Sequence, residues 1–175
     1  MKKKITLLFT CLVIIFSGTS CIKSLICVRG NGDLKVESRR SQKFTAIENT
    51  TSFDVIYKIA DTFGIEVEAE ENLIDYIKTD THGESIEITT SPGTICLNYT
   101  IKPVIRISSP SLSEIYNSGS GDIIAGNLSG NIVIVKNTGS GDVSTDRVDA
   151  GDIDFSDTGS GNIKCNSAIC QNSDI

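Results

Sequence analysis

Three acidic or amide side chains hold the same place in a motif that recurs every 20 residues: Asp122, Asp142 and Asn162. Each follows a Gly-Ser-Gly run and precedes a β-branched residue. If successive copies pair as strands, these groups stand about 4.8 Å apart, where like charges repel unless a cation lies between them. Their oxygens could ligate calcium, or they could accept hydrogen bonds from turn amides, as Asp and Asn commonly do. We favour the second interpretation.

A second polar column runs beside the first and holds Asn117, Asn137 and Asp157, each followed by Ser or Thr. An amide and hydroxyl ladder of this kind either caps the corner of a fold or offers a flat polar face to a glycan. We favour the structural role. The glycine-rich runs are not phosphate loops, because no Gly-Lys-Ser or Gly-Lys-Thr follows them.

Few residues support catalysis. His82 is the only histidine and is expected in a hairpin turn, so a Ser-His-Asp triad would need an unusually placed base. Asp152 and Asp154 share one face of a predicted strand and could serve a glycan-degrading enzyme, but strand acids in this arrangement are common. No cysteine spacing matches a zinc site. We predict no catalytic residue, no metal and no cofactor.

The motif that carries the polar columns occupies residues 117–123, 137–143 and 157–163. A 20-residue length of extended chain, at roughly 3.3 Å per residue, traces a perimeter of about 65 Å, which suits short strands joined by corners. We predict an all-β fold, a single-stranded β-helix or β-solenoid with 20-residue coils, in which the glycines supply corner conformations of positive φ. Three apolar columns share the period: Ile123, Val143 and Ile163; Leu128, Val148 and Ala168; and Ile115, Val135, Phe155 and Ile175.

Strand-like patterns precede the repeats. Residues 53–59 and 65–70 alternate apolar and polar side chains, which predicts strands with one buried face. Residues 71–77 have helical spacing for barely two turns and are expected to connect strands, and Gly83 marks a hairpin turn. We expect residues 22–43 to be an extended linker and residues 44–175 to form strand-rich coils or hairpins followed by the solenoid. Because no cap is visible after the third motif, we expect this domain to be truncated at its C-terminal end.

The first 21 residues have the pattern of a lipoprotein-type signal peptide. Three lysines precede an apolar run over residues 5–16, and small residues lead to Cys21. The run is too short to cross a bilayer, which takes about 20 apolar residues. The segment resembles a bacterial lipobox, with Gly18 where a leucine is usual, which implies that Cys21 is acylated and anchors the protein in a membrane. We predict export to the cell envelope as an outer-membrane lipoprotein.

Charge and cysteine content narrow the class of partner and the compartment. Removal of residues 1–21 takes away three lysines and no acid, so the net charge changes from −6 to −9. An acidic chain is unsuited to phosphate-backbone contacts, and we expect no nucleic-acid partner. Four cysteines remain, Cys27, Cys96, Cys165 and Cys170, and outside the cytoplasm they could form disulfides. Cys165 and Cys170 fall in one coil and could be close, but buried free thiols are equally compatible with the sequence.

Several weak motifs occur in a specific order, at residues 44–47, 53–55, 65–73, 105–112 and 119–123. Together they resemble the bacterial family called putative auto-transporter adhesin, head GIN domain, over about residues 29–175. This resemblance implies a secreted or surface-attached β-helical protein.

The function expected from these observations is that of a non-enzymatic cell-envelope lipoprotein whose β-solenoid acts in adhesion or binds a polymer or protein. A surface glycan or a protein is the expected ligand. A glycan-degrading enzyme on the same scaffold is one alternative. Another is a structural module that oligomerises end to end through an uncovered last coil.

Overall fold

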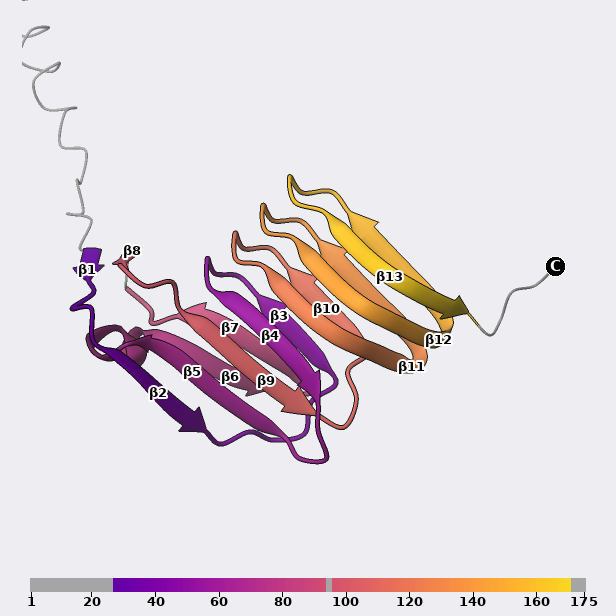
Figure 1. Cartoon of the computed structure of the whole chain (residues 1–175), viewed down its shortest axis with the longest axis horizontal. Helices are drawn as coiled ribbons and strands as arrows, with labels where there is room; N and C mark the ends of the chain where they lie inside the picture. Colours follow the sequence, from indigo (N-terminus) through magenta and orange to yellow (C-terminus); the bar gives the residue numbers. More distant parts are fainter. Residues whose placement is uncertain (1–26, 94–95, 171–175) are drawn as a thin grey trace, which may run out of the picture.

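The computed structural model of the chain describes residues 27–93 and 96–170. Strands dominate it, and the helical element among these residues is a short 3-10 helix, which confirms the all-β prediction (Figure 1). Within the same ranges, no helix is long and apolar enough to cross a bilayer. The elements are β1 (Cys27–Arg29), β2 (Leu34–Arg39), β3 (Ala46–Asn49), β4 (Asp54–Ile59), β5 (Gly64–Glu70), η1 (Glu71–Tyr76), β6 (Ile77–His82), β7 (Ser85–Thr90), β8 (Cys96–Asn98), β9 (Val104–Ser109), β10 (Glu114–Asn117), β11 (Ile123–Asn137), β12 (Val143–Asp157) and β13 (Ile163–Cys170).

The C-terminal part is a stack of parallel strands offset by 20 residues. β10 pairs with the second half of β11, β11 pairs with β12 along nearly its full length, and β12 pairs with β13. Ile123 lies beside Val143, and Val143 lies beside Ile163, as the apolar column predicts. Figure 1 shows these strands as successive layers. The period of the sequence is therefore the register of the strand pairing, although Ile175 lies outside the described residues.

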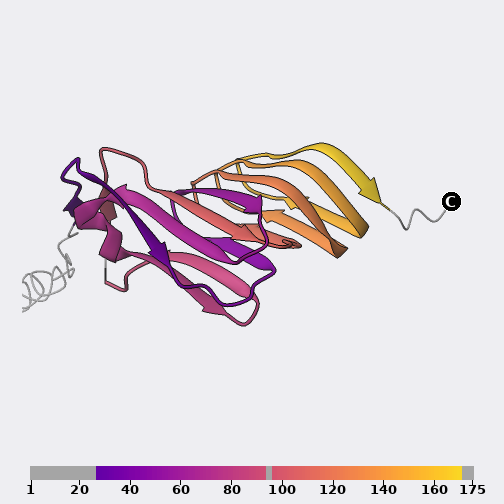
Figure 2. The same cartoon turned by 60° about the horizontal axis from the view of Figure 1, so that its bottom comes forward.

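The same layers continue into the first half of the chain through strands that are distant in sequence. β3 pairs in parallel with β10, and β4 pairs in parallel with the first half of β11, at an offset of 68 residues. β7 and β9 form the next layer, beside β3 and β4. Beyond them, β6 pairs antiparallel with β7, and β5 and β2 extend the β9 side, also antiparallel. The result is one 11-stranded sheet curled into a half-barrel (Figure 2).

The interior of the curled sheet holds one apolar cluster. Alternate side chains of each strand face it, such as Val55 and Tyr57 of β4 and Ile105 and Ile107 of β9, all at most 2% exposed. Burial of an apolar side chain of this size stabilises the fold by roughly 1.5–3 kcal/mol. The predicted one-sided strands, the short connector η1 and the hairpin at Gly83 are all present.

Residues 34–39, within the segment expected to be an extended linker, form the edge strand β2 and pair with six residues of β5. Arg39 ties this strand across the curl, because its guanidinium donates to the carbonyls of Ile74 (3.1 Å) and Ile77 (2.7 Å). The polar composition of residues 34–39 suits this position, since charged side chains on an edge strand discourage pairing with another chain.

Cys27 and Cys96 form a disulfide that joins β1 to β8, a separate two-stranded sheet. Cys165 and Cys170 are free thiols, the second of the two possibilities that the sequence left open for them. Both lie on β13, where Cys165 is in register with Thr145 of β12 and Cys170 with Ala150.

The glycines of the repeated motif allow close approach of adjacent backbones and do not supply the corner conformations of positive φ that the sequence predicted. Among the described residues, positive φ occurs only at three glycines outside the motif, namely Gly32, Gly83 and Gly93. A Cβ on Gly139 would instead lie far inside van der Waals contact of the Gly119 carbonyl oxygen. Glycine is required because the backbone of the neighbouring layer comes too close for any side chain.

Candidate functional site

One corner of the curled sheet carries the polar columns in four stacked rows. The rows lie between β3 and β4, between β10 and β11, between β11 and β12, and between β12 and β13 (Figure 1). Every second side chain of each row is exposed or half-buried, and we call these twelve residues the corner ridge. They are Thr50, Ser52 and Asp54; Ser118, Ser120 and Asp122; Thr138, Ser140 and Asp142; and Thr158, Ser160 and Asn162.

Backbone hydrogen bonds keep the rows of the corner ridge in register. The amides of Ser118 and Ser120 donate to the carbonyls of Asn49 and Thr51 (both 2.9 Å), and equivalent bonds join the later rows. Because the same positions bond in every row, the ridge has three straight columns with a repeat of about 4.8 Å. The columns hold Ser or Thr, then Ser, then Asp or Asn.

Within residues 27–93 and 96–170, six hydroxyl groups of the corner ridge have no hydrogen-bond partner. Their side chains are exposed, and no hydrogen bond within residues 27–93 and 96–170 involves them. The first row differs, because Thr50 donates to the Ile88 carbonyl (3.1 Å) and Ser52 accepts from Tyr99 (3.3 Å). A hydroxyl both donates and accepts, so the later rows offer a periodic array of both functions to a ligand. The six are Ser118, Ser120, Thr138, Ser140, Thr158 and Ser160.

The Asp column of the ridge bonds turn amides. The amide of Asp122 donates to Oδ1 of Asp54 (2.9 Å), that of Asp142 to Asp122 (2.8 Å) and that of Asn162 to Asp142 (2.9 Å). Within the part of the chain that the structure describes, no group of three or more His, Cys, Asp or Glu side chains is arranged to hold a metal ion.

Lysines neutralise two members of the Asp column. Lys102 pairs with Asp54, and Lys164 donates to Oδ2 of Asp142 at 2.6 Å. The hydrogen bonds from Lys164 and then from Asn162 hold the pKa of Asp142 below its ordinary value. Among the described residues, Asp122 is therefore the one carboxylate of the Asp column that has no lysine partner.

The Asn column faces the interior. Asn49, Asn117 and Asn137 are at most 1% exposed. Nδ2 of Asn137 donates to the Gly141 carbonyl (3.0 Å) and to Oδ1 of Asp157 (3.4 Å), and Nδ2 of Asn117 donates to Oδ1 of Asn137 (3.3 Å). This amide ladder closes the corner from within, and buried amides cannot present a polar face to a glycan.

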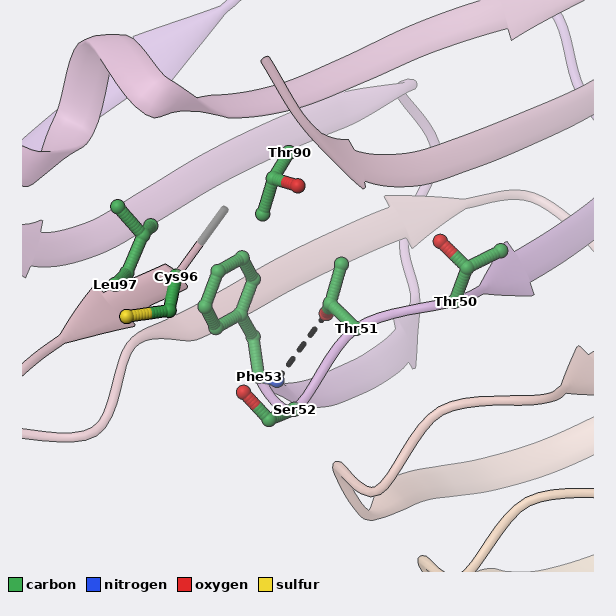
Figure 3. A pocket seen from close by; sticks show the side chains of 7 residues that line it. All are labelled: Thr50, Thr51, Ser52, Phe53, Thr90, Cys96 and Leu97. Carbon is green, nitrogen blue, oxygen red and sulfur yellow. Dashed lines mark hydrogen bonds between the residues drawn. The ribbon is translucent and has the colours of Figure 1, made fainter. Parts of the chain in front are cut away.

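A pocket lies at the N-terminal head of the corner ridge. Residues 91–103 join β7 to β9 in the layer next to the one where residues 50–53 join β3 to β4, so the β7–β9 layer has a long excursion in place of a tight corner. The excursion leaves a cavity of about 270 Å³, which we call the head pocket (Figure 3). Its lining residues are Thr50, Thr51, Ser52, Phe53, Thr90, Cys96 and Leu97.

Thr51 and Phe53 stand where the later rows have glycine. The backbone of a preceding row would exclude their side chains, but in this layer the excursion has left that space open. Figure 3 shows the Phe53 ring among the other side chains that line the pocket. The Thr51 hydroxyl donates to Oδ1 of Asn49 (2.7 Å) and accepts from the Phe53 amide (3.1 Å), which fixes both residues.

A buried carboxylate ties the excursion to the N-terminal segment. Glu70 is 0% exposed and accepts from the Gly32 amide (2.6 Å), the Thr100 amide (2.8 Å) and the Thr100 hydroxyl (2.6 Å). The hydrogen bond from the Thr100 hydroxyl is the main reason that the pKa of Glu70 lies below its ordinary value, since burial alone would raise it. The Cys27–Cys96 disulfide joins the same two segments a second time.

The sequence analysis did not predict two parts of this site, namely its first row and the buried Glu70. The first row lies 68 residues before its neighbour and lacks the glycines, although its Asn-x-x-Ser-x-Asp order, starting at Asn49, matches the motif and was a usable signal. Glu70 ends a run in which Glu66 and Glu68 alternate with apolar residues, and nothing in that run distinguishes the buried member.

The remaining candidate residues do not assemble into a site. His82 is exposed in the β6–β7 hairpin and lies 3.5 Å from Glu87. Asp152 and Asp154 are exposed on β12, where Asp154 lies 4.0 Å from Lys136. The candidate acylation site, Cys21, lies outside the described residues.

Comparison with solved structures supports the fold. A crystal structure described as a putative adhesin from Parabacteroides merdae superimposes with a TM-score of 0.74 at 25% identity, over 81% of this chain and 60% of that one. A putative adhesin from Parabacteroides distasonis gives 0.60 at 16% identity, over 82% and 69%. A putative lipid binding protein from the same species gives 0.53 at 22% identity, over 80% and 65%. The chain thus spans about three-fifths of the Parabacteroides merdae protein.

None of the curated proteins matches the chain. A family model does match it, over residues 43–174, which include all four rows of the corner ridge and the head pocket. The protein therefore belongs to the family described as putative auto-transporter adhesin, head GIN domain.

Proposed function

We propose that this protein is a non-enzymatic cell-envelope lipoprotein that binds a hydroxyl-rich surface polymer along its corner ridge. The observation that carries this proposal is the array of six exposed hydroxyls without intramolecular partners, repeated at the spacing of the strands. A periodic array suits a periodic ligand, because each added repeat of the polymer meets the same groups one row further on.

The wider setting supports an adhesive role. The parallel pairing at a 20-residue offset supports the proposal that the repeats form a β-solenoid, which would present the same surface on each coil. The basic start, the apolar run and Cys21 fit an exported chain held in the outer membrane by acyl chains. The family is described as an adhesin domain, which favours binding over catalysis.

Charge restricts the ligand to a neutral or amine-bearing polymer. The Asp column borders the hydroxyl columns, and Asp122 in the middle of it is exposed. The chain without residues 1–21 carries a net charge of −9. This net negative charge would disfavour polyanions such as uronate-rich or phosphate-rich polymers. Neutral polysaccharides have the required repeated hydroxyls without that repulsion.

The test is a glycan array probed with residues 22–175, followed by affinity measurement on the best polymer. The ridge variant replaces Thr138→Val and Ser140→Ala, and its matched control replaces Thr62→Val and Ser167→Ala, two exposed hydroxyls away from the ridge. Two lost hydrogen bonds at about 0.5–1.5 kcal/mol each should weaken binding by roughly tenfold or more in the ridge variant alone. Equal affinities for the two variants, or no polymer bound at all, would overturn the proposal.

A further inference from the structure

Strand β2 lies at one end of the 11-stranded sheet and pairs with a strand on one side only, namely β5. In Figure 1 it is the outermost strand at the lower left. Side chains on both of its faces are exposed over residues 33–36, and the apolar residues Leu34 and Val36 are 51% and 57% exposed. The outer edge of β2 is therefore open to a partner.

The hydrogen-bond pattern shows which backbone groups lie on this edge. The Glu71 amide donates to the Asp33 carbonyl (2.7 Å), and these two residues are opposite each other in the β2–β5 register. Because bonded residues alternate along an antiparallel pair, every second residue of β2 has its N–H and C=O on the side away from β5. Within residues 27–93 and 96–170 these groups have no hydrogen-bond partner. The three residues are Leu34, Val36 and Ser38.

The charges along residues 33–39 have opposite signs on the two sides of Val36. Lys35 precedes it and Glu37 follows it, while Asp33 and Arg39 lie three positions away on either side. In an antiparallel pair of two copies centred on Val36, Lys35 of each copy faces Glu37 of the other. Asp33 of each copy likewise faces Arg39 of the other. A second copy of this strand is therefore complementary to the first in charge.

The same register matches the free backbone groups. Leu34 and Ser38 face each other across the pair, Val36 faces itself, and all three have N–H and C=O directed toward the partner strand. The exposed side chains of Leu34 and Val36 lie on one face, where diagonal neighbours of two paired strands are within reach of each other. One register thus joins hydrogen bonds, charges and apolar contacts.

The charged side chains of β2 have partners in their own chain as well. Lys35 lies 3.4 Å from Glu71, and Glu37 lies 2.8 Å from Arg39. An ammonium has three donors and a carboxylate has two acceptor oxygens, so each can add a contact across the pair. Charges on an edge strand discourage pairing with most chains, but they favour a partner with the opposite charge at every facing position.

We propose that β2 pairs antiparallel with β2 of a second copy of this chain, about a two-fold axis at Val36. Such a contact is closed and joins the two curled sheets edge to edge. One strand pair is a small interface, so the association is weak in solution. The surface is separate from the corner ridge, and the proposed function does not depend on it.

The first experiment measures self-association of residues 22–175 by sedimentation velocity, from about 1 μM to about 1 mM. Val36→Pro removes an N–H that does not bond β5, which an edge strand tolerates, and Val36→Thr is the matched control that keeps this N–H. The wild type and the control should form a dimer. Val36→Pro should weaken it by about tenfold or more, because the central hydrogen bonds are lost.

The second experiment exchanges charges. Lys35→Glu and Glu37→Lys each place like charges opposite each other, so each variant alone should dimerise about tenfold more weakly or worse than the wild type. In an equal mixture of the two, every facing pair has opposite charges again, and the dimer should return. The controls Lys43→Glu and Glu84→Lys make the same charge changes at exposed positions off β2, and should dimerise like the wild type alone and mixed.

Each result decides the proposal. A wild type that stays monomeric at the highest concentration, or assemblies larger than a dimer, would overturn it. So would a Val36→Pro variant that associates like Val36→Thr, or a mixture of Lys35→Glu with Glu37→Lys that associates no better than its components. Recovery in the mixture also shows that both charge variants are folded, which separates a lost contact from a lost fold.

Discussion

Residues 113–170 and residues 27–109 build the same layered sheet, yet only residues 113–170 do so from a repeated motif. In the repeats, each layer follows the previous one after 20 residues, and glycines let the backbones of adjacent corners touch. In residues 27–109, strands β3 and β4 pair with strands that lie 68 residues later in the chain, and antiparallel strands end the stack. The first row has Thr51 and Phe53 in the glycine positions because the neighbouring layer has no tight corner whose backbone would pack against it.

This difference shows where each part obtains its stability and its surface. The repeats are nearly identical layers, so each layer presents the same exposed groups. The N-terminal part is irregular, and it holds its long excursion in place with a disulfide and a buried carboxylate. The regular repeats form most of the ridge, and the irregular N-terminal part forms the pocket at its head.

The sharpest way to break the repeated part is to add one methyl group between two layers. Gly139→Ala places a Cβ against the Gly119 carbonyl oxygen, so the corners must separate and the free energy of unfolding should fall by about 3 kcal/mol or more. Gly126→Ala is the matched control, because a Cβ there meets open space, and its effect should stay within about 0.5 kcal/mol. Urea unfolding followed by circular dichroism measures both, and similar values would contradict the close-approach argument.

The N-terminal part should depend most on its disulfide. Cys27→Ser with Cys96→Ser removes a cross-link between residues 69 positions apart and should lower the free energy of unfolding by about 2–4 kcal/mol. Cys170→Ser changes an exposed free thiol and should be neutral within about 0.5 kcal/mol. The same urea titration, with and without reductant, reports the effect. A double variant as stable as the wild type would show that the cross-link does not brace the excursion.

The two sides of one corner row can be compared directly. Asn137→Ala removes a buried amide and leaves the Gly141 carbonyl without this donor, at a cost of about 1–3 kcal/mol. Thr138→Ala, one residue along, removes an exposed hydroxyl and should change stability by less than about 0.5 kcal/mol while it weakens polymer binding. Thermal melting and affinity together separate the inward structural column from the outward binding column. Equal stability losses would refute that division.

The smallest expected effect concerns pH. Because the pKa of Glu70 is lower in the folded protein than its ordinary value of 4.5, the carboxylate contributes stability above that value and loses it as the pH falls through the folded pKa. Glu70→Gln should therefore be less stable than the wild type at neutral pH, and the gap should narrow in acid. Glu71→Gln, at an exposed neighbour, is the matched control for the loss of one carboxylate. Melting temperature recorded against pH distinguishes the two curves.

The sequence analysis identified the repeated part well and the site only partly. The 20-residue period predicted the register of Asp122, Asp142 and Asn162 because parallel strands in register place equivalent residues side by side. The sequence does not show that the Asn column faces inward and the hydroxyl column outward, because this depends on the side of the corner on which the core lies. Asp54 belongs to the Asp column because β4 pairs with β11, and the 20-residue period does not predict this pairing.

The sequence by itself determined the β-rich composition, the repeat, its register and the polar character of the corner, because these follow from local residue patterns and a fixed spacing. Only the tertiary structure decided the rest: the row at residues 50–54, the partner of Cys27, the burial of Glu70 and the pocket beside Phe53. Each of these arises where segments distant in the chain meet, and which segments meet is set by the packing of one shared core and not by any local pattern.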